Sequence, residues 1–571
     1  MASDDHTVTD DGYAASPSDV DTDIDVTIIG AGFSGLYMLH KMRELGLEAR
    51  IFEKAESVGG TWYWNCYPGA ACDSESYIYC YSFDDELLAD WTWSERYPRQ
   101  PEVLNYLQHV ADRFDLREDI QFNSEIVAAS FDGRLGCWKL RTEGDSYFLS
   151  RFLITGVGCL SKPTAPEFDG MNDYRGDLYH TARWPQDGVN LTNQKVGVIG
   201  TGSSGIQVST AIVDRVEKLS VFQRTPNYAI PAGNHPINQS EMTEIQQRYD
   251  DIWKETHRSP FGRPLEAEHD TAEDLSMEEV TEILEPRWNT GGFQFQLAFD
   301  DLLSNPTTNK KVAQFIRSKI HEAVDDPETA EKLTPRNHPF GSKRPPFQTG
   351  YYQMFNEGHV ELVDVNKSPI QQFTECGIET IDGYHNLDLV IFATGFDAMT
   401  GALLNIDIVG RDGQSLQDKW ENGPATYLGV SVQGFPNLFT ITGPQSPSVL
   451  SNMPVSIEHH VEWISGIIQH ILSSDYSYVE PTSEAEHYWV SHCNNIADQY
   501  LYSEADSWYL EKGSDGESRI FTAYAGGVRT YRDILSDVAK ENYEGFVFTE
   551  SCGEIDELSE NPAIATVEEN S

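Results

Sequence analysis

Two stretches of the chain share one order of apolar and polar positions. In the first, the β-branched run Ile24 to Ile29 meets the turn Gly30-Ala-Gly32-Phe-Ser-Gly35, and the segment Leu36 to Leu45 follows with helical periodicity. Gly46 marks the helix end, and Glu48 to Glu53 indicates a second strand. The pattern predicts a βαβ unit with a glycine loop after its first strand.

The second stretch repeats this order further along the chain. Lys195 to Ile199 is predicted as a strand, Gly200-Thr-Gly202-Ser-Ser-Gly205 as its turn, Ile206 to Val213 as a helix and Leu219 to Gln223 as the next strand. Two such units predict an α/β protein with two Rossmann-like dinucleotide-binding domains.

The pattern changes after the second unit. Polar, acidic, helix-like segments at Ser240 to Thr256, Met277 to Leu284 and Lys310 to Val324 predict a helical insertion, and strand-like stretches return at His359 to Val365 and Leu387 to Ala393. We therefore expect acidic tails over 1–23 and 551–571, a first domain from 24–150 and 386–550, a second from 151–231 and 340–385, and an insertion over 232–339.

Composition adds an extreme charge balance. The 571 residues include 91 Asp and Glu against 40 Lys and Arg, a net charge of −51. Such a field disfavours nucleic acid and anionic membranes as partners. An acidic partner-binding protein is one interpretation, but the excess runs along the whole chain. We therefore predict a halophilic protein, because concentrated salt would screen the self-repulsion.

Cellular location is indicated by the thiols and by the absence of apolar spans. Eight scattered cysteines without a CxxC pair or zinc-ligand spacing predict a cytoplasmic protein without a metal site. No run of about 18 apolar residues predicts a membrane span, and the acidic N-terminus does not resemble a signal peptide. The oligomeric state stays open, and a monomer is compatible with the sequence.

The residues that follow each second strand distinguish the two nucleotides. Glu53 ends the strand of the first unit, where a carboxylate accepts hydrogen bonds from a ribose with free hydroxyls, as in FAD. Gln223-Arg224-Thr225 follows in the second unit, where an arginine suits the 2′-phosphate of NADP. One glycine motif alone is a weak signal, but each here lies between a strand and a helix.

A segment between the glycine loops carries a family resemblance. Tyr174-Arg-Gly176-Asp-Leu-Tyr-His180-Thr-Ala-Arg-Trp184-Pro resembles the fingerprint of type I Baeyer–Villiger monooxygenases, with Tyr174 in place of Phe. Further signatures are Gly59 to Asp73, Gly341-Ser-Lys343-Arg344-Pro, Phe392 to Asp397 and Ser507-Trp508-Tyr509. The resemblance covers residues 24 to 550. Its closest group is the phenylacetone and cyclohexanone monooxygenases, and Gly443 to Met453 favours the phenylacetone branch.

The resemblance implies cofactors and their contacts. FAD and NADPH are expected as cofactors, with a ketone and O2 as substrates. For FAD the matching positions are Gly30, Gly32, Ser34, Gly35, Glu53, Thr61, Trp62, Trp64, Asp73, Tyr79 and Met453. For NADP they are Thr201, Gly202, Ser203, Ser204, Gly205, Ile206, Gln207, Arg224, Thr225, Lys343, Arg344 and Trp508.

The resemblance also implies the reaction. In this family a C4a-peroxyflavin attacks the ketone carbonyl, and the adduct rearranges to an ester or lactone. Arg344 matches the catalytic cation that stabilises the anionic adducts, and Asp73 matches the carboxylate that orients it. The fingerprint residues Gly176, His180 and Trp184 lie on a domain linker in the family, so we expect His180 to organise that linker.

Departures and rival functions leave some questions open. Ala71 stands where relatives usually carry Arg, and Tyr509-Leu-Glu511-Lys512-Gly513 replaces a Gly-Ala-Asn loop, which puts one cofactor contact and the loop's closure in question.

A disulfide reductase needs a CxxxxC pair, which Cys66 and Cys72 do not form. A heteroatom (N or S) monooxygenase is the main alternative. Arg344 and Asp73 argue against a non-catalytic NADP-binding sensor.

Overall fold

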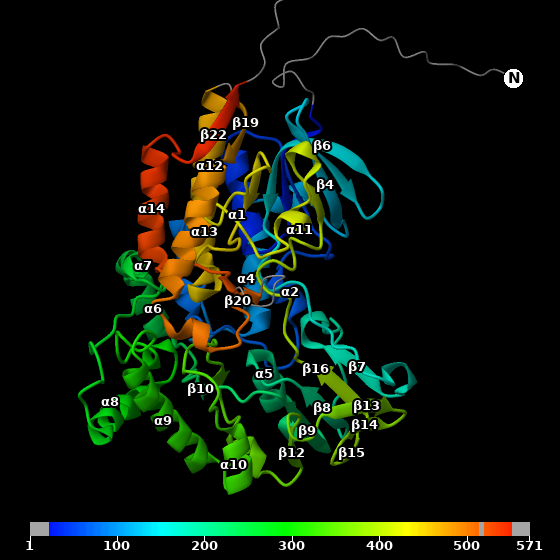
Figure 1. Cartoon of the computed structure of the whole chain (residues 1–571), viewed down its shortest axis with the longest axis vertical. Coiled ribbons are helices and arrows are strands. Elements are labelled where there is room, and N and C mark those ends of the chain that lie inside the picture. The colour runs from blue at the N-terminus through cyan, green and yellow to red at the C-terminus, as the bar shows by residue number, and fades with distance from the viewer. Residues whose placement is uncertain (1–21, 475, 513–518, 551–571) are drawn as a thin grey trace, which may run out of the picture.

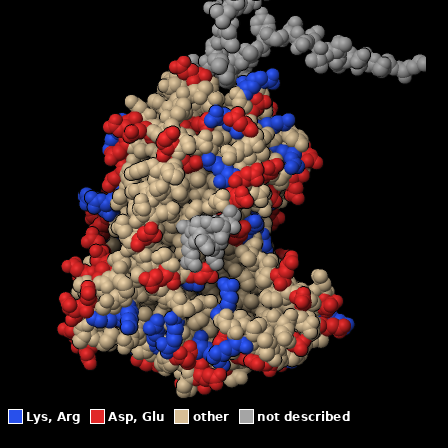
Figure 2. All heavy atoms as spheres, in the orientation of Figure 1, with Lys and Arg blue, Asp and Glu red and all other residues tan. Residues whose placement is uncertain are grey.

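The chain folds into two α/β units that lie end to end, each with its own sheet (Figure 1). The structure is a computed structural model that describes residues 22–474, 476–512 and 519–550. The predicted tails lie outside the described residues, apart from positions 22 and 23. Acidic side chains are spread over the visible face of both units (Figure 2).

The first unit contains an eight-stranded sheet centred on β1 (Ile24–Ile29). β1 pairs in parallel with β2 (Ala49–Phe52) and β6 (Tyr147–Thr155), so that Ile28 lies opposite Ile51 and Ile154. The order is β17-β4-β5-β6-β1-β2-β3, with β18 beside β6. The remaining strands are β3 (Ile120–Gln121), β4 (Ile126–Asp132), β5 (Cys137–Thr142), β17 (Asp407–Val409) and β18 (Leu438–Thr440).

Helices and two antiparallel strand pairs complete this unit. The helices are α1 (Phe33–Glu44), α2 (Thr61–Trp64), α3 (Asp85–Asp90), α4 (Gln100–Arg113), α11 (Leu416–Lys419), α12 (Met453–Ser473), α13 (Ser483–Ala497) and α14 (Val528–Lys540). The paired strands are β19 (Tyr476–Pro481) with β22 (Phe546–Glu550), and β20 (Leu510–Lys512) with β21 (Arg519–Phe521).

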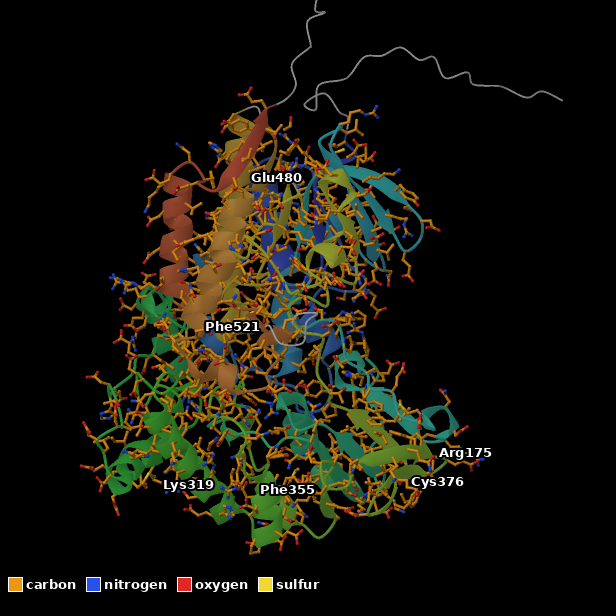
Figure 3. The ribbon with its side chains drawn as sticks, viewed as in Figure 1. Arg175, Lys319, Phe355, Cys376, Glu480 and Phe521 are labelled. Atoms are coloured by element: carbon orange, nitrogen blue, oxygen red, sulfur yellow. The ribbon has the colours of Figure 1, made fainter. Side chains whose placement is uncertain are left out.

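The second unit contains a parallel sheet of order β12-β9-β8-β16-β7. Its strands are β7 (Asp177–His180), β8 (Lys195–Ile199), β9 (Lys218–Gln223), β12 (Val360–Asp364) and β16 (Leu389–Phe392), and α5 (Ser203–Ile212) follows β8. A three-stranded meander, β13 (Ile370–Thr374), β14 (Gly377–Thr380) and β15 (Gly383–Asn386), lies at its outer end, where Arg175 and Cys376 are seen at the edge (Figure 3).

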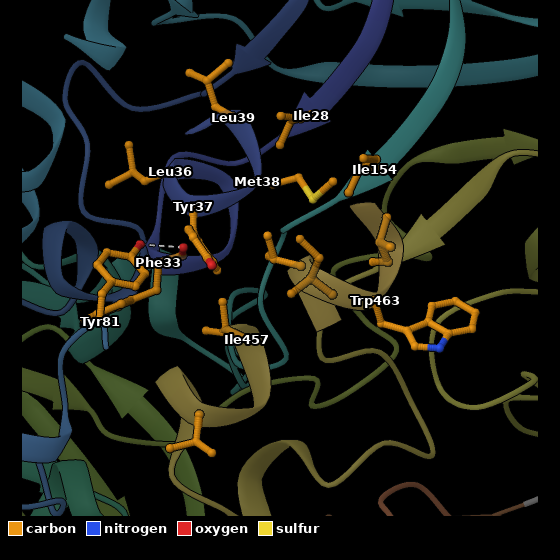
Figure 4. Packing of buried hydrophobic residues seen from close by; sticks show 14 of the residues in the cluster. Ile28, Phe33, Leu36, Tyr37, Met38, Leu39, Tyr81, Ile154, Ile457 and Trp463 are labelled. Atoms are coloured by element: carbon orange, nitrogen blue, oxygen red, sulfur yellow. Dashed lines mark hydrogen bonds between the residues drawn. The ribbon is translucent and has the colours of Figure 1, made fainter. Parts of the chain in front are cut away.

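Helix α1 is central to the first core. Leu36, Met38 and Leu39 are fully buried and pack with Ile28 of β1 and Ile457 of α12 (Figure 4). Burial of each such side chain contributes about 1.5–3 kcal/mol. This packing fixes the helix that starts at the first glycine loop.

Both glycine-loop helices begin earlier than the sequence pattern predicts. The expected starts were Leu36 and Ile206, but α1 begins at Phe33 and α5 at Ser203. The third glycine of each motif therefore lies inside the first helical turn, because the helix must pack closely on the loop. The pattern counted these glycines as turn residues.

The helical insertion is divided between the two cores. Its helices are α6 (Gln239–Gln247), α7 (Tyr249–Arg258), α8 (Met277–Thr290), α9 (Pro306–Ala323) and α10 (Pro327–Leu333), framed by β10 (Ile230–Pro231) paired with β11 (Phe347–Gln348). Trp253 of α7 packs into the core of the first unit, whereas Leu284 of α8 and Phe315 of α9 pack into that of the second. We call residues 259–276, which join these halves, the crossing segment.

Strand pairing corrects two of the expected domain boundaries. β6 runs to Thr155 within the first sheet, so the boundary at 150 is too early. β16 pairs with β7 and β8 of the second sheet, so the return to the first unit comes after Phe392 and not at 386. The other domain limits stay a prediction.

The chain passes between the units through a narrow neck. Pro163 and Phe396 form an antiparallel bridge, Thr164 N donates to Gly395 O at 3.0 Å, and Asp397 N donates to Lys162 O at 2.9 Å. We call these paired segments, 162–164 and 395–397, the neck. The outgoing and returning chains therefore lie side by side where they leave the first unit.

The described residues contain neither a membrane-spanning helix nor a cluster of metal ligands. No helix there has the length and apolar character needed to cross a bilayer. Within the same residues, no three His, Cys, Asp or Glu side chains are grouped as a metal site would require.

Candidate active site

The first glycine loop opens into a cavity of about 410 Å³. A Cβ on Gly35 would lie 1.8 Å from Gly30 O, so only glycine allows this contact between helix and loop. Gly32 faces Gly60 across the cavity wall, and neither presents a side chain. Nine of the residues assigned to FAD line the cavity, namely Gly30, Gly32, Ser34, Glu53, Thr61, Trp62, Trp64, Tyr79 and Met453.

Glu53 is held at the edge of this cavity by two backbone amides. Its carboxylate accepts hydrogen bonds from Ala31 N at 2.7 Å and Ala55 N at 2.8 Å, and its residue is only 4% exposed. A buried carboxylate fixed in this way presents its remaining lone pairs in one direction, which suits the hydroxyls of a ribose.

The second glycine loop has the same construction. A Cβ on Gly205 would lie 2.1 Å from Gly200 O, whereas a Cβ on Gly202 would meet no atom within 4 Å. The open side at Gly202 leaves room for a pyrophosphate at the start of α5. Thr201 Oγ1 donates to Thr225 O at 3.0 Å, which joins the loop to the segment after β9.

Helix α5 also contacts the first unit. Tyr67 Oη donates to Gln207 Oε1 at 2.6 Å and lies 3.3 Å from Ser204 Oγ, and Gln207 Nε2 donates to Ala71 O at 3.1 Å. The loop that follows α2 is thus fastened to the start of the second nucleotide helix.

Two cations assigned to the 2′-phosphate influence each other. Burial lowers the pKa of Lys343, Asp506 opposes that shift, and the charge of Arg224 adds to it. Two neighbouring cations are suited to one phosphate monoester. Trp508 is 37% exposed, and its ring centroid lies 4.4 Å from that of Tyr509.

Arg344 and Asp73 form a two-pronged ion pair that spans the units. Arg344 Nε donates to Asp73 Oδ2 at 2.6 Å and Nη2 donates to Oδ1 at 2.7 Å, while Nη1 donates to Val449 O at 2.7 Å. Burial disfavours the charged form of both side chains, but the charge and the hydrogen bonds of the partner outweigh this effect. The pKa of Asp73 therefore lies below its usual value and that of Arg344 above it. Both groups are charged at neutral pH.

Arg344 also lines a second, smaller cavity of about 70 Å³. Its wall is mostly apolar and includes Phe261, Phe293, Leu297, Leu303, Leu450 and Tyr509. Val449 lines both cavities, so the guanidinium is bonded to the wall that separates them. A fixed cation in a mostly apolar pocket next to the FAD cavity can stabilise negative charge on a reacting oxygen.

The fingerprint segment lies between the neck and β16. His180 Nδ1 accepts from Ala182 N at 3.0 Å, and Nε2 lies 3.3 Å from both Thr164 O and Thr394 Oγ1. Burial lowers the pKa of His180. Nε2 thus contacts both segments at the neck, whereas Nδ1 caps the fingerprint's own 3-10 turn. The organising role of His180 stays a prediction.

The other fingerprint residues are set by packing. A Cβ on Gly176 would lie 2.4 Å from Asp388 O, and Trp184 is buried at 4% exposure. Tyr174 Oη donates to Leu387 O at 3.0 Å, so the tyrosine that replaces phenylalanine gains a hydrogen bond inside the core.

Comparisons with known proteins agree with this geometry. The flavin-binding monooxygenase-like family model matches residues 23–236. A Baeyer–Villiger monooxygenase of Pseudooceanicola batsensis is 42% identical over 532 residues, 92% of this chain and 97% of that protein. A phenazine N-monooxygenase of Lysobacter antibioticus is also 42% identical, over 530 residues, 92% of this chain and 97% of that protein. An oxidised steroid monooxygenase bound to NADP superposes with a TM-score of 0.88 at 45% identity, covering 92% of this chain and 100% of that one.

The chain belongs to the Baeyer–Villiger monooxygenases. A relative solved with both FAD and NADP covers the same 92% of this chain, with a TM-score of 0.90 at 37% identity. The α/β fold with two nucleotide units, the cofactors FAD and NADP, and the monooxygenase class predicted from the sequence are confirmed. The two cavities fit this family, because bare glycine faces and a buried carboxylate line the first and a fixed guanidinium lines the second.

Two FAD-assigned residues of this monooxygenase do not line the first cavity. Gly35 lies under the loop, where it permits helix packing, and Asp73 faces Arg344 instead. Ala71, which replaces the usual arginine, pairs through its backbone with Arg99 and accepts from Gln207. Glu511 accepts from Thr400 Oγ1 at 3.4 Å, and Gly513 lies outside the described residues.

The sequence reasoning missed a buried cation beside Arg344. Arg263, in the crossing segment, is 4% exposed, and it donates to Asp73 O at 3.2 Å and to Ser74 Oγ at 3.0 Å. Its guanidinium lies 3.7 Å from Glu75 and 3.9 Å from the ring centroid of Phe293. The only signal was an isolated arginine in a Gly- and Pro-containing loop, which no periodic pattern identifies.

Proposed function

We propose that this monooxygenase oxidises ketones to esters or lactones in the cavity beside Arg344, with NADPH as reductant and O2 as oxidant. The observation that carries the proposal is the two-pronged Asp73–Arg344 pair, whose guanidinium lines the second cavity and donates to Val449, a residue that lines both cavities. When bound, reduced FAD together with O2 supplies the oxygen-transferring chemistry.

Arg344 is assigned as the catalytic cation. Asp73 holds two of its nitrogens and Val449 O holds the third, so the guanidinium stays in place without reorganising. A preorganised donor of this kind stabilises the negative charge that develops on the carbonyl oxygen of a ketone. Asp73 keeps that donor charged and oriented.

The remaining assignments concern cofactor binding. The residues that line the first cavity would hold FAD, with Glu53 at the ribose. The loop at Gly202 would hold the pyrophosphate of NADP, with Arg224, Thr225 and Lys343 at its 2′-phosphate and Trp508 beside it. The charge of Arg224 lowers the pKa of Lys343, and this electrostatic effect supports the phosphate assignment.

A ketone panel tests the reaction. The purified holoenzyme is supplied with NADPH and O2 in concentrated KCl, and cyclic, linear and aryl ketones are assayed by mass spectrometry. We expect at least one ketone to gain one oxygen atom as an ester or lactone. NADPH consumption that yields only H2O2 with every ketone would contradict the proposal.

Oxidation at nitrogen is a second candidate, because the Lysobacter relative is named for that reaction at 42% identity. Trp184 favours ketones, since related heteroatom monooxygenases usually carry Tyr or Phe there. Aromatic N-heterocycles are therefore included in the panel. An N-oxide formed faster than any ester would make nitrogen the preferred target.

A cytoplasmic location belongs to the same proposal. Seven cysteines in the described part of the chain are free thiols, as a reducing compartment favours. Secretion of the active enzyme by its source cells would contradict this location.

A further inference from the structure

Three basic side chains line the FAD cavity, and two of them are paired with carboxylates. Lys54 Nζ lies 3.9 Å from Glu125, and Lys162 Nζ lies 3.0 Å from Asp397. The third is Arg183, which forms no ion pair within 4.0 Å in the part of the chain that the structure describes. The charge of Glu125 acts on Arg183 from beyond that distance. This half-buried guanidinium therefore has no carboxylate in contact on the cavity wall and is suited to bind an anion.

Arg183 is held in place by its neighbour Ala182 and by two other parts of the chain. Nη1 donates to Ala182 O at 2.7 Å, and Nη2 donates to Ser161 O at 3.1 Å. Its guanidinium carbon lies 4.6 Å from the ring centroid of Trp64, which itself lines the cavity. These bonds use two of the five N–H donors, so the group is fixed but can still donate.

The anion that this cavity is built to receive is part of FAD. The glycine loop after β1 lies on the same cavity, and such loops bring backbone amides to a pyrophosphate. In oxidised FAD the pyrophosphate carries the negative charge, whereas the adenine, both sugar portions and the isoalloxazine ring are neutral. We propose that Arg183 binds the FAD pyrophosphate and is a cofactor-positioning residue of this enzyme.

This assignment gives the fingerprint a direct connection to the flavin cofactor. Arg183 belongs to the short 3-10 helix Thr181–Arg183, which directly follows β7 of the second sheet. A bond from Arg183 to FAD would thus join the second unit to the cofactor of the first. The inference rests on FAD binding and does not depend on the role of Arg344.

FAD affinity of the apoprotein tests the proposal without any turnover. The apoprotein is titrated with FAD, and binding is followed by flavin fluorescence. Arg183→Gln is expected to raise the FAD dissociation constant by about ten- to a hundred-fold, the range of a charge-assisted hydrogen bond, and Arg183→Lys by less. Arg175→Gln is the matched control, because Arg175 lies in the same segment but is exposed and paired with Glu375, and it should leave the constant unchanged.

ADP, which shares the pyrophosphate but lacks the flavin, identifies the part that Arg183 contacts. As a competitor of FAD, ADP should weaken by a similar factor in Arg183→Gln. If the FAD constant is unchanged, or if FAD weakens while ADP competes as before, the proposal is overturned. Should Arg183→Gln fail to fold, Arg183→Lys carries the same two measurements, with the melting temperature of the apoprotein as the check on folding.

Discussion

At the scale of single residues, the site depends on which groups accept hydrogen bonds from the Arg344 guanidinium. Asp73 takes two of its nitrogens and Val449 O the third, so the side chain has one position and one charge state. Arg263 holds the loop that carries Asp73 in place, because it donates hydrogen bonds to Asp73 O and Ser74 Oγ. The charge at the reacting centre is therefore set by side chains from both units.

Removal of the Arg344 side chain should separate flavin reduction from ester formation. In Arg344→Ala we expect NADPH to reduce FAD, followed by flavin absorbance in a stopped-flow instrument, while ester formation is lost. The reason is that the cation acts on the charged oxygen and not on hydride transfer. Arg336→Ala, an exposed arginine paired with Glu331, is the control. An ordinary ester yield in Arg344→Ala would remove the assignment.

Arg224 should determine the preference for NADPH. Arg224→Ala is expected to raise the KM for NADPH about ten-fold or more and to leave that for NADH nearly unchanged, because only NADPH carries the 2′-phosphate. Initial rates measured with both nucleotides give the ratio of the KM for NADPH to the KM for NADH. An unchanged ratio would show that Arg224 does not read the phosphate.

At the scale of elements, the glycine loops and their strands could be read directly from the sequence. The β-branched runs before Gly30 and Gly200 and the apolar faces after them are local signals, and β1, β8 and β9 lie where they were predicted. Local signals do not show how the helices of the insertion are divided between the two cores. The faces of α7 and α9 have similar patterns, and only the tertiary fold decides which core each one meets.

Arg263 and Arg183 show a second limit of the sequence pattern. Each is a single arginine in a loop, and its importance comes from partners far away in the chain, such as Asp73 and Trp64. Arg344 and Asp73, by contrast, could be found because family motifs surround them. The helix starts at Phe33 and Ser203 were missed because a glycine in a helical turn looks like a turn residue.

Helix α12 carries a buried carboxylate that should make stability depend on pH. Glu458 accepts from Ser82 N and Ser82 Oγ, both at 2.6 Å, and from Phe83 N at 3.2 Å. Burial nevertheless raises its pKa to about 7, from 4.5 in the unfolded chain. The folded state thus holds a proton that the unfolded state releases, so the contribution of Glu458 to stability is complete below pH 4.5 and is lost as pH rises through about 7.

Glu458→Gln tests this directly. Since glutamine does not titrate, the variant's unfolding free energy should fall less steeply than that of the wild type between pH 4.5 and 7, as measured by urea unfolding. Glu484→Gln, on the exposed side of α13, is the control and should keep the wild-type slope. Parallel curves for the wild type and Glu458→Gln would contradict the shifted pKa.

At the scale of the whole molecule, charge remains the largest untested property. The net charge is −51, and acidic side chains are distributed over the visible face of both units (Figure 2). The comparisons do not bear on salt adaptation, so it stays a prediction. Self-repulsion of this size should destabilise the folded chain in dilute buffer.

Salt should therefore stabilise the enzyme by screening. The thermal unfolding midpoint is expected to rise steadily between about 0.1 and 3 M KCl. Sucrose at matched water activity is the control, because it is excluded from the surface but screens no charge, and it should stabilise less. A midpoint indifferent to KCl would count against a halophilic protein.

The neck and the crossing segment are two of the places where the second unit is attached to the first. The neck is fastened by backbone bonds between Lys162 and Asp397, and the crossing segment by Arg263. Hydrogen bonds from Tyr67 to Gln207 and from Gln207 to Ala71 hold the start of α5 to the first unit as well. We therefore expect any displacement of the second unit that is large enough to part Arg344 from Asp73 to strain the bonds at the start of α5 too.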